Sequence, residues 1–403
     1  MSAIVQSQAV PCNGDCMRFM SASGLPLWVS NAELEPPLQK SRIAIVACAG
    51  VGLGGAQIRC VETARAMTAR NLSARCLTDC KQDTLASLAK HRYRSIIFIR
   101  NLPRTPEALS MLRRAACALL LDTLDLSPIW HRNSCSDRRL LAPLDGVIAN
   151  NQVSWARIAA DCPELARKPV HLIEHFHSIT RRVSDGSGWP GTGSERAPRP
   201  SSAPRALLVQ EHRVRGTVGF CRDIRMALPA GMHFGCHPLW GGFAAPKNRE
   251  GFFRDQLNLT QEAVRSIAAQ HFGVGAMFTA VYAKYDLLIQ WLPSNSSAQR
   301  LSNALASGVP VIAQSSPAFA EVHGVTRGVL LARDHTELRA MSQKLQDSQA
   351  LRRRVSEAGV QSAARFTADA IIAQYVRAIN AAARIREARP QGGERGVAIK
   401  CAA

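Results

Sequence analysis

Short, nearly uninterrupted apolar runs recur along the first half of the chain, and helix-like patterns separate most of them. The first run, RIAIVACAG (Arg42–Gly50), has the continuous hydrophobicity of a strand buried on both faces. Apolar residues then recur at helical spacing at Val61, Ala64 and Met67. Further strands are expected at Ser73–Leu77, Ser95–Arg100, Ala118–Asp122, Gly146–Asn150 and Val170–Phe176, and helices at Thr105–Ala116 and Ser154–Asp161. This alternation predicts a doubly wound α/β domain on a parallel sheet.

A break in composition separates this series from a second one. Residues 184–205, SDGSGWPGTGSERAPRPSSAPR, are rich in Pro, Gly and Ser and predict a linker or long surface loop. RGTVGFCRD (Arg215–Asp223) is expected to be the opening strand of the second series, and GVLLA (Gly328–Ala332) a later strand. From Thr336 to about Arg386 the apolar spacing is helical. The pattern therefore predicts two α/β domains followed by helices.

The segment Asp286–Glu321 carries the strongest indication of a ligand site. An apolar run stopped by Pro293 leads through a Ser/Asn cluster into a helix that Gly308 ends, and VPVIA begins another buried strand. The unpaired N–H groups of the first helical turn, with Gln299 and Arg300 beside them, favour an anion. This is where open α/β sheets bind phosphorylated ligands.

Taken together, these halves resemble the GT-B glycosyltransferases, and most of all the glycogen-synthase-like group (glycosyltransferase family 4, group 1). The resemblance rests on GLGGAQIR (Gly52–Arg59), on RGTVGFCRD, and on the helices of Leu351–Ile379. It rests also on Pro293–Ala313, which resembles the family's donor loop and ends in its Ala-x-Gly-x-Pro-Val-Ile signature. It implies two Rossmann-like doubly wound domains facing a central cleft, with a C-terminal crossover helix. The expected parts are a leader (1–40), a first domain (41–183), the linker or loop (184–205), a second domain (206–368), a crossover helix (369–388) and a tail (389–403).

The resemblance also implies an activity and a set of site residues. The expected reaction is hexosyl transfer from a nucleotide-diphospho-sugar to a glycan or lipid-linked acceptor, as in cell-surface polysaccharide biosynthesis. Cations and helix-end N–H groups on the leaving diphosphate would stabilise its developing negative charge. No metal or cofactor is expected beyond the nucleotide-sugar co-substrate. The candidates are Arg222, Arg300 and Asn303 for catalysis; Gly54, Gly55, Ser296, Ser297, Gln299 and Glu321 for the donor diphosphate and nucleotide; and Asp122 and His175 for the acceptor.

Particular residues suggest three other interpretations. Asn295 and Asn303 stand where the family often has two glutamates, and an amide cannot act as a carboxylate. A GT-B-like protein that binds nucleotide sugars or glycans without turnover is therefore an alternative. Gly50–Gly55 matches GxGxxG, with Asp79 where a ribose-binding acid could lie, so an NAD(P)- or flavin-dependent oxidoreductase is a second. His171–His175 matches HxxEH, but a strand-like run would place Glu174 opposite the histidines, which argues against zinc.

Composition adds a few limits. The formal net charge is +20, which reflects either genomic composition bias or attraction to nucleotide diphosphates or an anionic membrane face. Aromatic residues make up only 5% and no nucleic-acid-binding signature occurs, so nucleic acid is not an expected partner. Twelve scattered cysteines without zinc-site spacing predict reduced buried thiols. The chain lacks a long apolar run and a secretory signal, so we expect a cytoplasmic protein, with peripheral contact at the inner membrane face as an option.

Overall fold

The fold is described here from a computed structural model, which places two parallel sheets and the helices around them. It describes residues 43–48, 58–91, 93–103, 105–115, 117–123, 138–177, 204–211, 217–239, 282, 285–291, 299–317, 319–321 and 328–388, some of them, such as 207–211, 217–221, 236–239 and 299–300, by their backbone alone.

The first sheet has six parallel strands in the order β2-β1-β3-β4-β5-β6. Its strands are β1 (Ile43–Val46), β2 (Ala74–Leu77), β3 (Ser95–Ile99), β4 (Ala118–Asp122), β5 (Gly146–Ala149) and β6 (Val170–Leu172). The segments between them form η2 (Ile58–Glu62, a π-helical turn), α2 (Thr63–Thr68), α3 (Gln82–Lys90), α4 (Pro106–Arg114), α6 (Arg138–Leu141), α7 (Gln152–Asp161) and α8 (Pro163–Ala166). These strands match the expected runs closely, although β6 ends at Leu172 and not at Phe176.

The second sheet has five parallel strands in the order β11-β10-β9-β7-β8. Its strands are β7 (Arg205–Glu211), β8 (His233–Leu239), β9 (Leu287–Gln290), β10 (Val311–Gln314) and β11 (Val329–Ala332). Its helices are α9 (Thr217–Ala227), α13 (Gln299–Ser307), α15 (His335–Asp347) and α16 (Gln349–Ala363), followed by the turn η3 (Ala364–Phe366) and by α17 (Ala368–Ala388).

The prediction that RGTVGFCRD forms the opening strand of the second domain is wrong. RGTVGFCRD falls largely within α9, and the opening strand is β7, which begins at Arg205, the last residue of the segment assigned to the linker. Ile224 and Ala227 of α9 are buried three residues apart, which is helical spacing. A short apolar run fits a strand or a buried helix equally well, and here the run in RALLV was the true strand.

Both sheets are apolar on their two faces, as expected for parallel strands covered by helices on each side. Along β1, Ile43 and Ile45 face one core while Ala44 and Val46 face another, and each exposes 7% of its surface or less. Helices α3, α4, α7 and α8 cover the second of these faces. The other face is covered by η2, α2 and α17.

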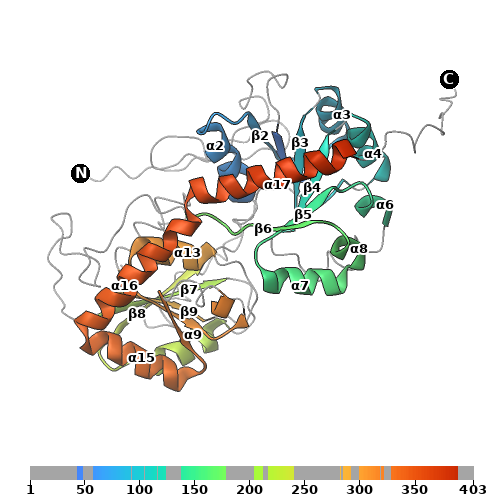
Figure 1. The fold of residues 1–403 in the computed structure, drawn as a ribbon. Helices are drawn as coiled ribbons and strands as arrows, with labels where there is room; N and C mark the ends of the chain where they lie inside the picture. The colour runs from blue at the N-terminus through green and yellow to red at the C-terminus, as the bar shows by residue number, and fades with distance from the viewer. Residues whose placement is uncertain are drawn as a thin grey trace, which may run out of the picture.

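The long helix α17 belongs to both domains. It follows the helices of the second domain and then lies along the first, against α2, β3, β4 and β5 (Figure 1). Its buried residues include Ile371, Tyr375 and Ile379. They share one continuous hydrophobic core with Leu301 of α13 and Val311 of β10. The two domains are thus joined by a common core as well as by the chain.

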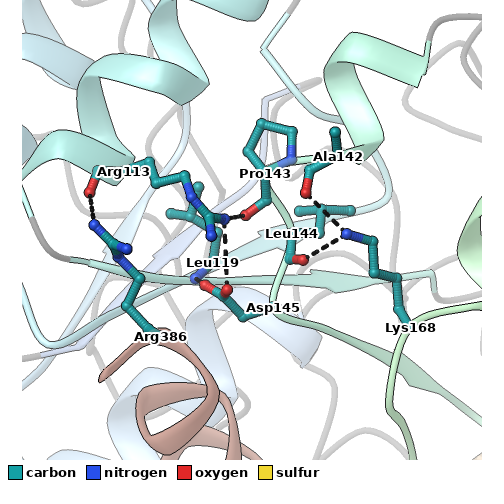
Figure 2. Close-up of polar contacts among 8 residues, drawn as sticks. All are labelled: Arg113, Leu119, Ala142, Pro143, Leu144, Asp145, Lys168 and Arg386. Carbon is teal, nitrogen blue, oxygen red and sulfur yellow. Dashed lines mark hydrogen bonds and ion pairs between the residues drawn. The ribbon is translucent and has the colours of Figure 1, made fainter. Parts of the chain in front are cut away.

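The far end of α17 is fixed at the amino edge of the first sheet (Figure 2). The Arg386 guanidinium donates to the carbonyl oxygen of Arg113 at 2.8 Å. Arg113 in turn lies 3.5 Å from the Asp145 carboxylate, whose other oxygen accepts the N–H of Leu119 at 3.0 Å. Lys168 donates to two carbonyl oxygens of the loop before β5. None of the helices in the described ranges is long and apolar enough to cross a bilayer.

Candidate functional site

Polar residues follow the strands of the first sheet at their carboxyl ends. Asp122 ends β4, Asn150 and Asn151 follow β5, and His175 lies three residues beyond β6. All four expose 2% or less of their surface. Because the strands are parallel, these side chains gather at one edge of the sheet. In both sheets the first and third strands along the chain are neighbours, β1 and β3 in the first sheet and β7 and β9 in the second. The strand order reverses between these neighbours, and ligands bind at such a switch point, outside the carboxyl ends of the strands.

A buried arginine organises this edge. Arg59 of η2 is 1% exposed, and its Nη1 donates to the Tyr375 hydroxyl at 2.7 Å and lies 3.5 Å from Asp122 Oδ2. The Tyr375 hydroxyl donates to the same carboxylate oxygen at 2.8 Å. Arg59 Nη2 donates to Asn150 Oδ1 and to the Ile173 carbonyl. The charge of Arg59 is thus matched by a carboxylate and by neutral acceptors, as a buried ion needs.

This cluster of Arg59, Asp122 and Tyr375 joins distant parts of the chain. It holds the crossover helix against the carboxyl edge of the first sheet, and burial raises the pKa of the Tyr375 hydroxyl, which stays protonated as a donor. Asp122, an acceptor-side candidate, is fully buried and engaged in these contacts. A contact of Asp122 with an acceptor remains a prediction.

His175, the other acceptor-side candidate, is held as a neutral imidazole. Burial lowers its pKa well below the ordinary value, and the charges of Arg59 and Arg100 lower it further. Neither ring nitrogen has a hydrogen-bond partner within the described residues. Two polar nitrogens are therefore buried at the carboxyl edge and are available to a ligand or water.

Two glutamates lie close enough for one to affect the pKa of the other, and one of them links the two domains. Glu321, in the short helical turn after β10, accepts the N–H of Gln152 at 3.3 Å, at the amino end of α7 in the first domain. Burial raises the pKa of Glu174 to about 7; Arg365 opposes the shift and Glu321 adds to it. Oε2 of each glutamate is buried without a partner in the described part of the chain. The pair offers acceptors for hydroxyl groups and a proton that is exchangeable near neutrality.

In the second domain, α13 is the element described next along the chain after β9. Gln299 and Arg300 form its first turn, and Asn303 is fully buried one turn further along. Gly308, with φ of 77°, ends the helix in the left-handed conformation expected of a C-terminal glycine. Gly54, Gly55, Ser296 and Ser297 lie outside the described residues, as do the side chains of Gln299 and Arg300.

The candidates therefore separate into two groups. Asp122 and His175 meet around Arg59, and Glu321 reaches the first domain. Arg222 is exposed on α9, and the described residues show no contact between it and the other candidates. Within these ranges, no group of three or more His, Cys, Asp or Glu side chains is placed to hold a metal ion. His171 and Glu174 fall on β6 and the turn after it, so HxxEH is not helical here.

Three residues of this edge, Arg59, Tyr375 and Glu174, had no predicted role in the site. Arg59 lies between Ile58 and Cys60 in an otherwise apolar stretch, and a charged residue on a buried face is the signal that it needs a partner. Nothing local identifies Tyr375 as that partner, because 316 positions separate the two.

Comparisons with known proteins bear on the fold. Neither the family models nor the curated proteins contain a match. Among solved structures, the chain is similar to sucrose-phosphate synthase from Thermosynechococcus elongatus, with a TM-score of 0.57 and 15% identity over 85% of this chain and 98% of that one. It is also similar to HepE from Anabaena in complex with UDP, with a TM-score of 0.53 and 14% identity over 84% of this chain and 99% of that one.

A glycosyltransferase from Rickettsia africae is a third, with a TM-score of 0.54 and 11% identity over 87% of this chain and 100% of that one. Structures of HepE with UDP and glucose and with UDP-glucose also match. These neighbours are GT-B glycosyltransferases, and the match extends over nearly their whole length. The chain has the GT-B fold, in which two Rossmann-like domains are joined by a helix that crosses back to the first.

Proposed function

We propose that this protein transfers a hexosyl group from a nucleotide-diphospho-sugar to a hydroxyl of a glycan or lipid-linked acceptor. The observation that carries the proposal is the meeting of both domains at the carboxyl edge of the first sheet, where Glu321 of the second domain caps α7 of the first. Solved neighbours that bind UDP and UDP-glucose support a nucleotide-sugar donor. The glycogen-synthase-like group remains part of this proposal.

In this mechanism the donor diphosphate lies at the first turn of α13. Backbone N–H groups there point along the helix axis toward the ligand, and the positive end of the helix dipole favours the charge that develops as the sugar leaves. Asn303 would hydrogen-bond the donor through its amide, and Glu321 would accept hydroxyl protons. The proposed donor contacts are Gly54, Gly55, Ser296, Ser297, Gln299, Arg300 and Glu321, with Arg222 as a further cation.

On the acceptor side, the neutral His175 is suited to accept or donate a hydrogen bond to a hydroxyl without adding charge. Asp122 would contact the acceptor from its place in the cluster of Arg59, Asp122 and Tyr375. No metal enters the scheme, because helix N–H groups and arginine supply the positive charge.

The test is donor binding followed by turnover. Thermal shift and calorimetry with UDP-, GDP- and ADP-glucose, beside NAD(P)H, should show stabilisation by one nucleotide sugar. Arg300→Ala should weaken that binding roughly tenfold or more, since a charge-assisted contact to phosphate is worth about 1.5–3 kcal/mol. Arg354→Ala, an exposed arginine of α16, is the matched control. Stabilisation by NAD(P)H alone would refute the transferase.

A nucleotide-sugar-binding protein without turnover is the second candidate. Asn303, a buried amide where the family often has a glutamate, favours it. Binding of the donor with neither hydrolysis nor transfer to glycan or lipid-linked acceptors would select this alternative.

A further inference from the structure

Two thiols face one another inside the first domain, away from the carboxyl-edge site. Cys60 of η2 and Cys76 of β2 are 0% and 3% exposed, and their Sγ atoms lie 2.8 Å apart. The Cys60 thiol also lies 3.3 Å from the carbonyl oxygen of Ile45 on β1. The corresponding contact of Cys117, another buried cysteine, is longer: its Sγ lies 4.0 Å from the carbonyl oxygen of Ala115. The Cys60–Cys76 pair thus joins two elements at one point.

The geometry favours a covalent bond between these sulfurs. A disulfide has an S–S length of about 2.04 Å, so the two atoms need to approach by only about 0.8 Å. A change of that size is within reach of small side-chain rotations. The backbone at Cys76 is fixed by the pairing of β1 with β2, in which Ile45 lies opposite Cys76, and Ile45 is also the residue whose carbonyl oxygen the Cys60 thiol contacts.

We propose that Cys60 and Cys76 form a redox-sensitive pair that closes to a disulfide on exposure to peroxide and thereby ties η2 to β2. One thiolate attacks a peroxide oxygen, forming a sulfenic acid and releasing water. The second thiol attacks that sulfur and displaces a second water. The two sulfurs lose two electrons and two protons, and the peroxide is reduced to two waters.

Burial sets the kinetics of this step. It raises the pKa of Cys60, as does the neighbouring Cys76, so the Cys60 thiol is protonated at rest. The thiolate therefore forms during local opening of η2 and α2, and the closed pair reacts more slowly than an exposed thiol. Peroxide is small enough to enter through such an opening.

The bond would act on the segment that carries Arg59. Arg59 directly precedes Cys60 and contacts both Asp122 and Tyr375. Oxidation would restrain the start of η2 and α2. Through Arg59, it would also restrain the contact between η2 and the crossover helix α17. The proposal needs no assumption about the reaction that the protein catalyses.

Peptide mapping tests the proposal directly. The full chain is treated with hydrogen peroxide, alkylated under denaturing conditions and digested with trypsin. The expected product joins CVETAR (residues 60–65) to CLTDCK (residues 76–81), with a loss of about 2 Da relative to the sum of the free peptides, and dithiothreitol releases it. Fragmentation must place the bond on Cys76, because Cys80 lies in the same peptide and close to Cys48.

Matched variants make the result decisive. Cys80→Ser and Cys117→Ser should keep the linked product, whereas Cys60→Ser and Cys76→Ser should lose it. Hydrogen exchange across residues 58–68 should slow in the oxidised wild-type chain. The proposal is overturned if Cys60 and Cys76 are both alkylated after oxidation, if they end as sulfinic acids, or if the bond maps to Cys80. The wild-type mapping decides the question even if a serine variant fails to fold.

Discussion

At the scale of single residues, the buried cluster of Arg59, Asp122 and Tyr375 carries a large energetic consequence. Each member is 1% exposed or less, so a polar group that loses its partner cannot form a hydrogen bond with water instead. Removing one hydrogen bond here is therefore more damaging than removing a surface ion pair of similar geometry.

Tyr375→Phe tests this difference. The change removes an acceptor from Arg59 and a donor from Asp122 while it keeps the ring, and it should lower the free energy of unfolding by about 1–3 kcal/mol. Urea denaturation measures the effect. Asp369→Asn is the control on the same helix, since the Asp369 side chain is 83% exposed and its ion pair with Arg70 should contribute about 0.5 kcal/mol or less. Equal effects of the two changes would contradict the role of the cluster.

Glu174 should make stability depend on pH. Its pKa is raised from 4.5 to about 7, so the folded state binds the proton more tightly than the unfolded state does. The stabilisation by this proton is full below about pH 4.5 and is lost as the pH rises through about 7. Glu174→Gln should thus stabilise the protein at about pH 8 and have little effect at about pH 4.5, as measured by urea midpoints. Glu164→Gln, on α8, serves as the control, and a pH-independent effect at Glu174 would contradict the assignment.

At the scale of elements, the close approach of β11 to α16 depends on two glycines. A Cβ on Gly328 would lie 2.5 Å from the backbone nitrogen of Gly359, whereas a Cβ on Gly359 would lie 3.2 Å from the Leu305 side chain of α13. The first clash is with backbone and the second with the end of a flexible side chain. The two positions therefore differ in what can move.

Gly328→Ala should be the more harmful of the two changes. It forces β11 and α16 apart and should cost about 1–3 kcal/mol, as overpacking does. Gly359→Ala should be close to neutral, because a gain of about 0.5–1 kcal/mol in helix propensity offsets the shift of Leu305. Chemical denaturation of both variants checks the order. A reversal of that order would show that the two backbones are not in contact.

The elements also show what sequence could and could not predict. β3 and β4 were predictable because each is a fully buried strand of five residues with four apolar residues in a row. α9 was mistaken for a strand, because Val218 to Cys221 form a run too short to distinguish the two periods. The partners of Arg59 had no local signal, since Asp122 and Tyr375 come from β4 and α17. For the candidate site, the sequence predicted its place at the carboxyl edge of the sheets but not the contacts between its side chains.

At the scale of the whole molecule, the two domains share one hydrophobic core in addition to the core that each has of its own. Residues of β1, β10 and α17 belong to one cluster, so loss of the crossover helix should expose the face of the first sheet that it covers.

Truncation before Ala368 tests this dependence. The shortened chain should bind the dye ANS and lose its cooperative thermal transition, because Ile371, Tyr375, Ile379 and the other buried residues of α17 are gone. A chain shortened after Ala388 removes only residues beyond the helix and should melt as the full chain does. A cooperative transition in the first variant would show that the first domain is stable without α17.

The crossover helix also has a consequence for how the chain is made. The first sheet is complete by Leu172, yet the helix that covers one of its faces ends at Ala388. On the ribosome, the first domain therefore emerges with an apolar face open and waits for more than half of the chain before its last element is synthesised. We expect chaperones to be needed most in that interval, and the order of synthesis to set the yield of folded protein.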